Sequence, residues 1–451
     1  MPGLVQGLET ARRALLAHQA ALTVTGNNLA NVATEGYSRQ SAILQPTPPE
    51  PTPDGYIGTG VRLEEVRRAR DGFLDLQIRN ELGLQGKWAG RSETLAQLEN
   101  ILNEPSDMGL SQAMDDFWNA WLDLSNQPDD PAARAVVVRS GEALAQGLRQ
   151  LHARTQAIIE NTDADLEQRV RHLNGLCNEL AVLNSQIARS EVAGSIESAL
   201  RDRRDLILDE LARDGGATMI VRADEMAVVR LGGRTVVEGS TAIPMEIQRY
   251  NDDGHVRVRV AFASDLTAPE FNTGTLAGLL EVRDTILPGF LEEMDQMTAA
   301  VVEQVNRLHR AGPSHLDFFR GQTVAELEVN PEIANDLTQV NPGTTGEPGD
   351  NDIALAMAAL RDARVMDRGT STIGDFYRRA VADIGSLSQQ AANLSDSQTT
   401  AVETLEGRRQ AVMGVNLDEE LTRMMTTQKA YEAAARVFSV ASEMLDVLLA
   451  L

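Results

Sequence analysis

A single cysteine and a shortage of aromatic residues limit how this chain of 451 residues can be held together. Because Cys177 is the only cysteine, no disulfide can form within one chain. Aromatic residues make up 4% of the sequence, whereas hydrophobic residues reach 42%. A core that relies on Leu, Val, Ile, Met and Ala favours helices packed on helices over a large β-sandwich.

Positive charge and long apolar runs are scarce as well. The formal net charge is −25, and a surface this acidic repels phosphate backbones and anionic lipids. No stretch approaches the ~20 apolar residues that span a bilayer, and the N-terminus lacks the basic start of a secretory signal peptide. We therefore expect no nucleic-acid partner and no membrane insertion, and export, if it occurs, by another route.

Apolar residues repeat at alternating steps of four and three at both ends of the chain, which is the spacing of a coiled-coil seam. The N-terminal seam comprises Leu4, Leu8, Ala11, Leu15, His18, Leu22, Thr25 and Leu29. The C-terminal seam comprises Leu417, Leu421, Met424, Gln428, Tyr431, Ala435, Phe438, Ser442, Leu445 and Leu449. Both seams are narrow and contain polar positions, so neither helix should be stable alone.

Periodicity alone leaves two interpretations of these seams open. Each seam could pack on its own domain, or the two could pair, so that everything between them forms one excursion from a shared stalk. In the second case the contacts between the helices would come from Leu8, Leu15, Leu22 and Leu29 on one side and Leu421, Met424, Tyr431, Phe438 and Leu445 on the other.

The middle of the chain reads as helices with one inserted β unit. Residues 41–60 are rich in Pro and Gly and predict an extended connector. A helical pattern follows from about 61 to 212, in which Asp130 caps a helix that starts at Pro131, and Cys177 lies on an apolar stripe that predicts a buried packing role. The period changes to two near residue 214, where Gly232-Gly233 predicts a hairpin turn.

We therefore predict a mainly α fold with a small β domain, an α+β multidomain protein. Residues 1–36 and 415–451 form the terminal coiled coil. Residues 37–213 and 273–414 form a helical-bundle domain, and residues 214–272 form the inserted antiparallel β domain.

No residues support an enzyme, a cofactor or a metal site. The six histidines form no zinc-binding spacing. Asp115 and Asp116 adjoin Phe117, but neighbouring carboxylates point about 100° apart on a helix and do not face one site. Gly58-Thr59-Gly60 lacks the strand and the third glycine of a dinucleotide loop. We expect no catalytic activity and no cofactor.

The segment that follows the first seam carries a recognisable motif. Residues 27–40 read NNLANVATEGYSRQ, in which Asn27, Asn28, Asn31, Gly36 and Tyr37 match the N-terminal signature. This signature resembles that of the flagellar rod, hook and hook-associated proteins, and its GYSRQ continuation is similar to hook-associated members in particular. Asn416, Leu417 and Asp418 match the C-terminal signature of the same family, and residues 130–134 and 350–355 resemble shorter family motifs.

The resemblance implies a structural subunit at the hook–filament junction of the bacterial flagellum. It further implies about eleven copies in a ring-like zone, contacts with hook protein and with hook-associated protein 3, and unfolded export through the flagellar type III apparatus. An export chaperone would cover the C-terminal helix, and the mature protein would be extracellular. The outer domain that larger relatives carry after the long helix is absent, because Gly312 lies only a few residues before Asp317.

Two alternatives remain. The chain could be another flagellar axial protein of the hook or rod type. It could also be a coiled-coil effector secreted by a type III apparatus, although the Asn-rich signature and residues 414–420, GVNLDEE, argue against that.

Overall fold

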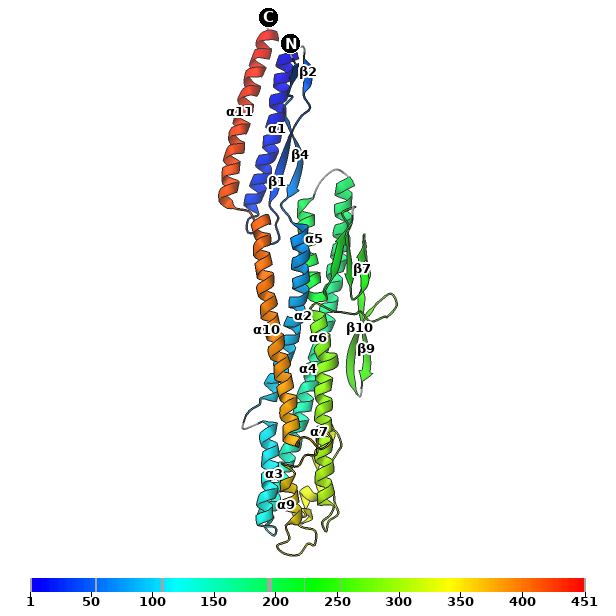
Figure 1. The fold of residues 1–451 in the computed structure, drawn as a ribbon. Coiled ribbons are helices and arrows are strands. Elements are labelled where there is room, and N and C mark those ends of the chain that lie inside the picture. Colours follow the sequence, from blue (N-terminus) through cyan, green and yellow to red (C-terminus); the bar gives the residue numbers. More distant parts are fainter. Residues whose placement is uncertain are drawn as a thin grey trace.

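The computed structural model describes residues 2–52, 55–106, 109–192, 197–222, 224–252 and 254–449. The protein is elongated, with both chain termini at one end (Figure 1). It is mainly helical, and its strands form small antiparallel sheets, which confirms the predicted fold class. In the described part of the chain, no helix is both long and apolar enough to cross a membrane.

The terminal helices α1 (Pro2–Ala30) and α11 (Leu417–Leu449) pack on each other and run in opposite directions. The interpretation in which the two ends pair is therefore the one that the structure adopts. The paired helices lie at one end of the molecule beside strands β1–β4, and we call α1, α11 and these strands the terminal unit.

Strands correct two predictions in this part of the chain. They occupy most of the described residues of the connector predicted at 41–60, and they also occupy residues 61–68, where the sequence predicts a helical pattern. Strand β1 (Gln40–Pro46) pairs with β4 (Val61–Arg68), and β2 (Glu50–Thr52) pairs with β3 (Gly55–Ile57). Both sheets have only two strands, so prolines without an N–H can occupy their ends and edges. Strands β1 and β4 pack along α1 and thus lie beside the terminal helices.

Long helices form the rest of the molecule, which we call the helical body (residues 71–414). Helix α4 has 62 residues, which at 1.5 Å per residue gives a length of about 90 Å. As predicted, α4 starts at Pro131, and the Asp130 side chain accepts a hydrogen bond from Ala132 N at 2.9 Å. The helices are α2 (Gly72–Leu102), α3 (Leu110–Asn126), α4 (Pro131–Val192), α5 (Ser198–Gly215), α6 (Thr275–Glu281), α7 (Leu287–His309), α8 (Pro331–Asn335), α9 (Asp352–Ala359) and α10 (Ile373–Met413), and a π-helical segment, Val282–Ile286, joins α6 to α7.

The β unit packs on α4 and α5 through one apolar cluster. Its strands are β5 (Thr218–Val221), β6 (Ala227–Leu231), β7 (Arg234–Glu238), β8 (Thr241–Ala242), β9 (Met245–Asp252) and β10 (His255–Phe262). Gly232 and Gly233 form the predicted β6–β7 turn, with φ angles of 53° and 85° that favour glycine. Cys177 is buried in this cluster, and burial raises the pKa of its thiol to about 12, so the predicted packing role is confirmed.

An aromatic cluster closes the end of the helical body that lies farthest from the termini. It contains Phe117, Trp121, His309, Phe318 and Phe319, whose neighbouring rings lie 4.9–6.4 Å apart. The chain returns from α7 to β11 (Phe319–Arg320) through residues 310–318, all of them described, without a further domain. A last short strand, β12 (Glu328–Val329), pairs with β11.

His309 is the one ionisable group of that aromatic cluster, and its hydrogen bonds require a neutral ring. Its Nδ1–H donates to Leu316 O at 2.7 Å, and its Nε2 accepts from Asn341 N at 3.1 Å. A proton on Nε2 would place two donors against each other. Burial also lowers the pKa of His309, so the folded state resists protonation.

We predict that His309 makes this end of the molecule sensitive to acid. The unfolded chain takes up a proton as the pH falls below about 6.5, whereas the folded chain does not, so the free energy of unfolding falls by up to ~1.4 kcal/mol per pH unit. Above that pH the histidine adds no pH dependence. Urea unfolding followed by tryptophan fluorescence at pH 7.5 and 5.5 measures the slope.

His309→Gln should flatten this pH slope, although it lowers stability at every pH by about 1–3 kcal/mol because buried polar partners lose their bonds. The matched control is His172→Gln, since His172 is exposed beside Glu210. An unchanged slope in His309→Gln would contradict the prediction.

Candidate assembly site

The inner face of the terminal helix pair contains most of the predicted seam residues. Leu8, Leu15, Leu22 and Leu29 are half-buried on α1, and Met424, Tyr431, Phe438 and Leu445 are half-buried on α11. The most deeply buried positions of α1 are instead small or polar, namely Ala11, Ala17, Thr25 and Asn28. The Leu449 side chain lies outside the described part of the structure. The structure thus brings eight of the nine predicted interhelix residues to partly covered positions.

Leu421 is the exception, because it is 40% exposed, as is its neighbour in the predicted seam, Leu417, at 46%. The buried position at the base of α11 belongs to Glu420, which is fully buried. Thr427 likewise takes the half-buried position predicted for Gln428. The observed inner seam therefore runs through Glu420, Met424, Thr427 and Tyr431, still in steps of four and three.

Hydrogen bonding by Asn28 explains why Glu420, and not the predicted Leu421, occupies this buried position. The Asn28 amide donates to Glu420 Oε2 at 3.0 Å and to Gln40 O at 2.8 Å. Its Oδ1 accepts from Gln40 N at 2.8 Å and from the Tyr37 hydroxyl at 2.8 Å. Asn28 is fully buried, so this complete set of partners offsets the cost of removing its amide from water. One side chain thus connects α1, α11 and β1.

Burial, together with two nearby carboxylates, keeps the Tyr37 hydroxyl protonated. Burial, followed by the charges of Asp202 and Glu420, raises the pKa of Tyr37 to about 12. The phenol therefore remains protonated at neutral pH and can donate to Asn28.

The other signature residues shape the two turns at the base of the helix pair. Asn31 binds back to Asn27 through its backbone and side chain at 2.9–3.1 Å. Gly36 has a φ of +74°, and a Cβ there would come within 2.6 Å of Leu206 on α5. Asn416 caps α11 by accepting from Asp418 N at 3.0 Å, and Asp418 itself is exposed in the first turn.

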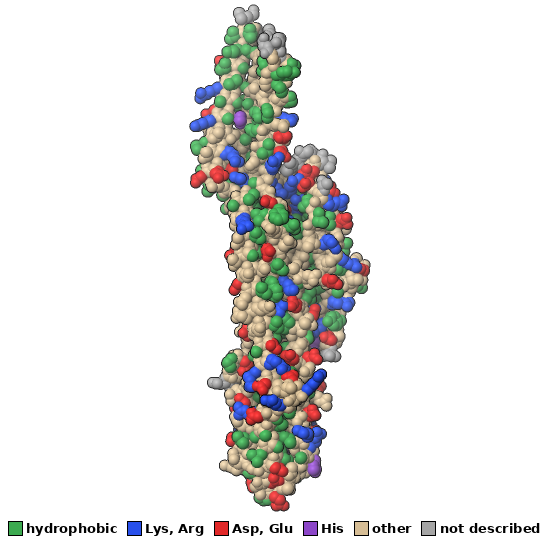
Figure 2. Space-filling view, viewed as in Figure 1, with side chains coloured by type: hydrophobic (Ala, Val, Ile, Leu, Met, Phe, Trp, Pro, Cys, Tyr) green, Lys and Arg blue, Asp and Glu red, His purple; other side chains and the backbone are tan. Residues whose placement is uncertain are grey.

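A second apolar seam follows α11 on a face that α1 does not cover. It comprises Ala430, Ala433, Val437, Val440, Met444 and Val447, again in steps of three and four. Val437, Val440, Met444 and Val447 are 50–63% exposed. We call this face the outer seam, and Figure 2 shows hydrophobic side chains exposed along the terminal unit. A regular seam of this kind is typical of a helix that packs on a further helix.

The terminal unit meets the helical body at a polar joint, which sequence reasoning missed. Arg68 at the end of β4 pairs with Asp202 at 2.7 Å and with Asp205 at 3.0 Å, both on α5. Asp202 also accepts from Ser38 Oγ at 2.7 Å and from Ser38 N at 3.2 Å. The charges involved come from segments more than 100 residues apart, so no local spacing in the sequence marks them.

The same ionic network continues into the helical body. Arg79 pairs with Asp209 at 2.7 Å, and Arg409 reaches Asp209 at 2.6 Å. Burial opposes the ionisation of Asp205, but the charges of Arg70, Arg68 and Arg79 outweigh it and hold the pKa of Asp205 below its ordinary value. Asp205 therefore stays charged, as its ion pairs require.

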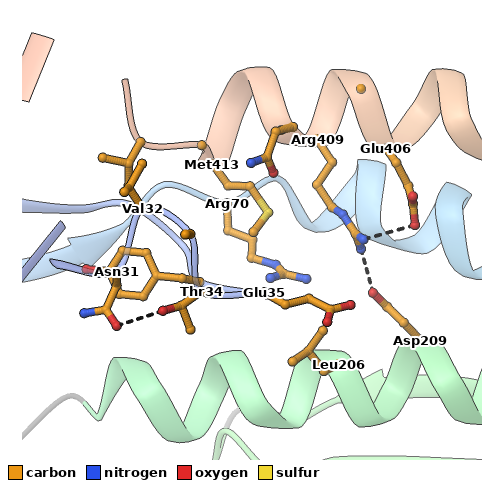
Figure 3. A pocket seen from close by; sticks show the side chains of 17 residues that line it. Asn31, Val32, Thr34, Glu35, Arg70, Leu206, Asp209, Glu406, Arg409 and Met413 are labelled. Atoms are coloured by element: carbon orange, nitrogen blue, oxygen red, sulfur yellow. Dashed lines mark hydrogen bonds and ion pairs between the residues drawn. The ribbon is translucent and has the colours of Figure 1, made fainter. Parts of the chain in front are cut away.

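A cavity of about 460 Å³ lies beside this network, between residues 31–37, α5 and the end of α10. Figure 3 shows Arg70, Asp209 and Arg409 lining it, with the loop that carries Asn31, Thr34 and Glu35 along one side. Each of the two arginines already has carboxylate partners, so the cavity presents no unpaired cation to a ligand.

The adjacent carboxylates that were considered as catalytic acids make ordinary surface contacts in the structure. Asp115 pairs with Arg361 at 3.1 Å, and Asp116 accepts from Gln112 at 2.7 Å. Among the residues that the structure describes, no three His, Cys, Asp or Glu side chains gather where they could hold a metal ion.

Family profiles match three parts of the chain. The profile described as "Flagellar hook-associated protein FlgK helical domain" matches residues 95–327. The one described as "Flagella basal body rod protein" matches residues 8–37, and "Flagellar basal body rod FlgEFG protein C-terminal" matches residues 410–451. The two short profiles coincide with the paired ends.

Curated relatives match over almost the whole length. Flagellar hook-associated protein 1 of Bacillus subtilis is 31% identical, over 99% of this chain and 98% of its own. Flagellar hook-associated protein 1 of Escherichia coli is 25% identical, over 98% of this chain and 99% of its own. The solved structure of the flagellar hook junction protein FlgK from Burkholderia pseudomallei has a TM-score of 0.66 and 14% identity, over 74% of this chain and 100% of that one, which is a likeness of fold.

We predict that Asn28→Asp opens the base of the helix pair. The new carboxylate would face Glu420 Oε2, which lies 3.0 Å from the Asn28 amide nitrogen, and repulsion would replace a hydrogen bond in a buried site, at a cost of about 3–5 kcal/mol. Hydrogen exchange followed by mass spectrometry should show faster exchange in residues 20–40 and 417–430. Asn27→Asp is the matched control, because Asn27 is exposed and its side chain acts as an acceptor. Equal exchange in the two variants would contradict the role given to Asn28.

Proposed function

This chain belongs to the flagellar hook-associated protein 1 family, and on that premise we propose that it is the structural adaptor at the hook–filament junction of a bacterial flagellum. The observation that carries the proposal is the pairing of the two chain ends, which hold the family signatures, into one unit at the end of an elongated body. Its role is structural, its location is the flagellum, and it associates with other flagellar axial components.

We propose that copies of the chain pack side by side through the terminal unit. The outer seam supports this, because it leaves a regular apolar face without a partner in one chain. Leu417 and Leu421, exposed at the base of α11, would add contacts there. The predicted interhelix leucines then act indirectly, since they hold α11 in place on α1.

The distribution of charge supports the same arrangement. Residues 1–70 and 415–451 carry 10 Lys and Arg against 12 Asp and Glu, whereas residues 71–414 carry 31 against 54. Copies can therefore approach through nearly neutral terminal units, while their acidic helical bodies repel one another and point apart. The terminal unit in this scheme includes strands β1–β4, which extends the predicted terminal domain from residue 36 to about residue 70.

The family resemblance supplies the finer partners of the proposal. About eleven copies would form a ring-like zone, with hook protein on one side and hook-associated protein 3 on the other. The chain would leave the cell unfolded through the flagellar type III apparatus. An export chaperone that covers Met424, Tyr431 and Phe438 would have to bind before α11 meets α1, because these side chains are half-buried in the folded chain.

A hook or rod protein remains the second candidate, because the profiles at the two ends describe basal body rod proteins. The match of the FlgK helical domain to residues 95–327 favours the junction adaptor.

Deletion of the gene tests the proposed role directly. We expect cells with hooks but without filaments, and flagellin shed into the medium, as seen by electron microscopy and by analysis of the culture supernatant. Normal filaments on the deletion strain would refute the adaptor, and loss of the hooks themselves would favour a hook or rod protein.

Complementation of the deletion strain with variants distinguishes the role of the outer seam from that of the inner seam. Val440→Asp in the outer seam should abolish filaments while the purified protein keeps the helix content of the wild type. Leu22→Asp and Phe438→Asp in the inner seam should also abolish filaments, but with loss of α1–α11 pairing, because a carboxylate replaces apolar contact and loses part of its hydration in this half-buried interface. Thr400→Asp is the control, because it adds the same charge at an exposed position on α10. Normal filaments with Val440→Asp would exclude the outer seam from assembly.

A further inference from the structure

The joint between the terminal unit and the helical body has the construction of a hinge. Only two covalent connections cross it, residues 69–71 between β4 and α2 and residues 414–416 between α10 and α11. With two connections alone, the terminal unit could still rotate relative to the helical body about the line that joins them. A third contact must therefore set the angle between the two parts.

The third contact is the loop of residues 31–39, which leaves α1, touches α5 and returns to β1. Asp202 on α5 holds this loop through both the hydroxyl and the backbone N–H of Ser38, and it also holds Arg68 of β4. Ser38 is fully buried, and Asp202 is 6% exposed. One carboxylate thus receives three hydrogen bonds from the terminal unit.

The other polar contacts across the joint lie beside the two covalent connections: Arg39 N donates to Met413 O at 2.8 Å, next to residues 414–416, and Arg70, within residues 69–71, pairs with Asp205 at 3.5 Å. Each of the three apolar clusters formed by described residues lies within the helical body, and none includes a residue of the terminal unit. Gly36 lies close to Leu206 of α5 at this joint, since a Cβ there would come within 2.6 Å of the Leu206 side chain. The cavity between residues 31–37, α5 and the end of α10 also leaves room for movement on that side. A polar contact in place of a packed core fixes an orientation without strongly stabilising it.

We propose that Asp202 is a latch that fixes the angle between the terminal unit and the helical body, and that its release allows the terminal unit to swing while both parts stay folded. The latch differs from the ion pairs among Arg79, Arg409, Asp75 and Asp209, because these four residues all belong to the helical body. It differs from the pairs of Arg68 and Arg70 with Asp205 and Asp75, because those start at the end of β4 and at the β4–α2 connection and do not hold the loop of residues 31–39. In Asp202→Asn, Arg68 keeps Asp205 as a partner, whereas Ser38 loses one of its two acceptor oxygens, because an amide NH2 donates and cannot accept from the Ser38 hydroxyl or backbone N–H. The latch acts within a single chain and does not depend on what the chain assembles with.

Distances between spin labels on the two parts test the latch in the full-length protein. Cysteines replace the exposed residues Glu403 on α10 and Glu432 on α11. Cys177 stays unlabelled, because it is buried and the pKa of its thiol is raised to about 12. Double electron–electron resonance then gives the distribution of distances across the joint.

The wild-type background should give one narrow distribution, and Asp202→Asn should give a broader one with additional distances. Ser38→Ala removes the hydroxyl hydrogen bonds to Asp202 and from Arg70 but keeps the one from Ser38 N to Asp202, so it should broaden the distribution less. Asp165→Asn is the matched control, since Asp165 pairs with Arg169 on the surface of α4, and it should leave the distribution unchanged.

Circular dichroism and urea unfolding of each variant establish that both parts remain folded. If Asp202→Asn fails to fold, Ser38→Ala alone decides. A distribution that stays as narrow as the wild type in the folded variants would overturn the latch. So would a wild-type distribution that is already as broad as that of Asp202→Asn.

Discussion

The packing of α1 on α11 is the constraint on which the rest of the structure depends. It brings together segments nearly four hundred residues apart, so everything between them must leave the terminal unit and return to it. Neither helix buries enough apolar surface to be stable alone. Each needs the other, and the position of both depends on Asn28, whose amide joins α1, α11 and β1 in one buried set of hydrogen bonds. A polar residue at one seam position is a known means of setting register, at some cost in stability.

Helix α11 has two apolar faces, one that packs within the chain and one that we propose for assembly. The inner seam meets α1, while the outer seam stays uncovered in one chain. Packing of the inner seam on α1 holds α11 in place, and this fixes the direction in which the outer seam faces. The terminal unit is nearly neutral and the helical body is acidic. This distribution of charge suits the proposed assembly, because close packing of identical copies tolerates apolar contact but not a concentration of like charge.

Polar contacts dominate where the two parts meet, whereas apolar clusters dominate within the helical body. Buried ion pairs contribute little net stability once their desolvation is counted, but they are specific in direction. Such a polar joint is consistent with the proposed latch, which fixes the angle between the terminal unit and the helical body but can be released. The aromatic cluster around His309 at the opposite end serves a different purpose, since it closes the loops there with apolar packing and a neutral imidazole.

The sequence by itself determined the local elements: the seams at both ends, the α4 start at Asp130-Pro131, the Gly232-Gly233 turn and the buried Cys177 all follow from spacing and side-chain chemistry within a few residues. It also indicated the family, through motifs at both ends. Only the tertiary structure decided that the ends pair, that strands β1 and β4 lie along α1, and that Glu420 rather than Leu421 faces inward. The last follows from a hydrogen bond that Asn28 donates to Glu420, 392 positions away. Local sequence patterns could not predict the joint either, because Ser38, Arg68 and Asp202 become neighbours only when segments far apart in the sequence pack together. Helical or strand periodicity indicates which face of an element a residue occupies, but it does not indicate which other element packs on that face.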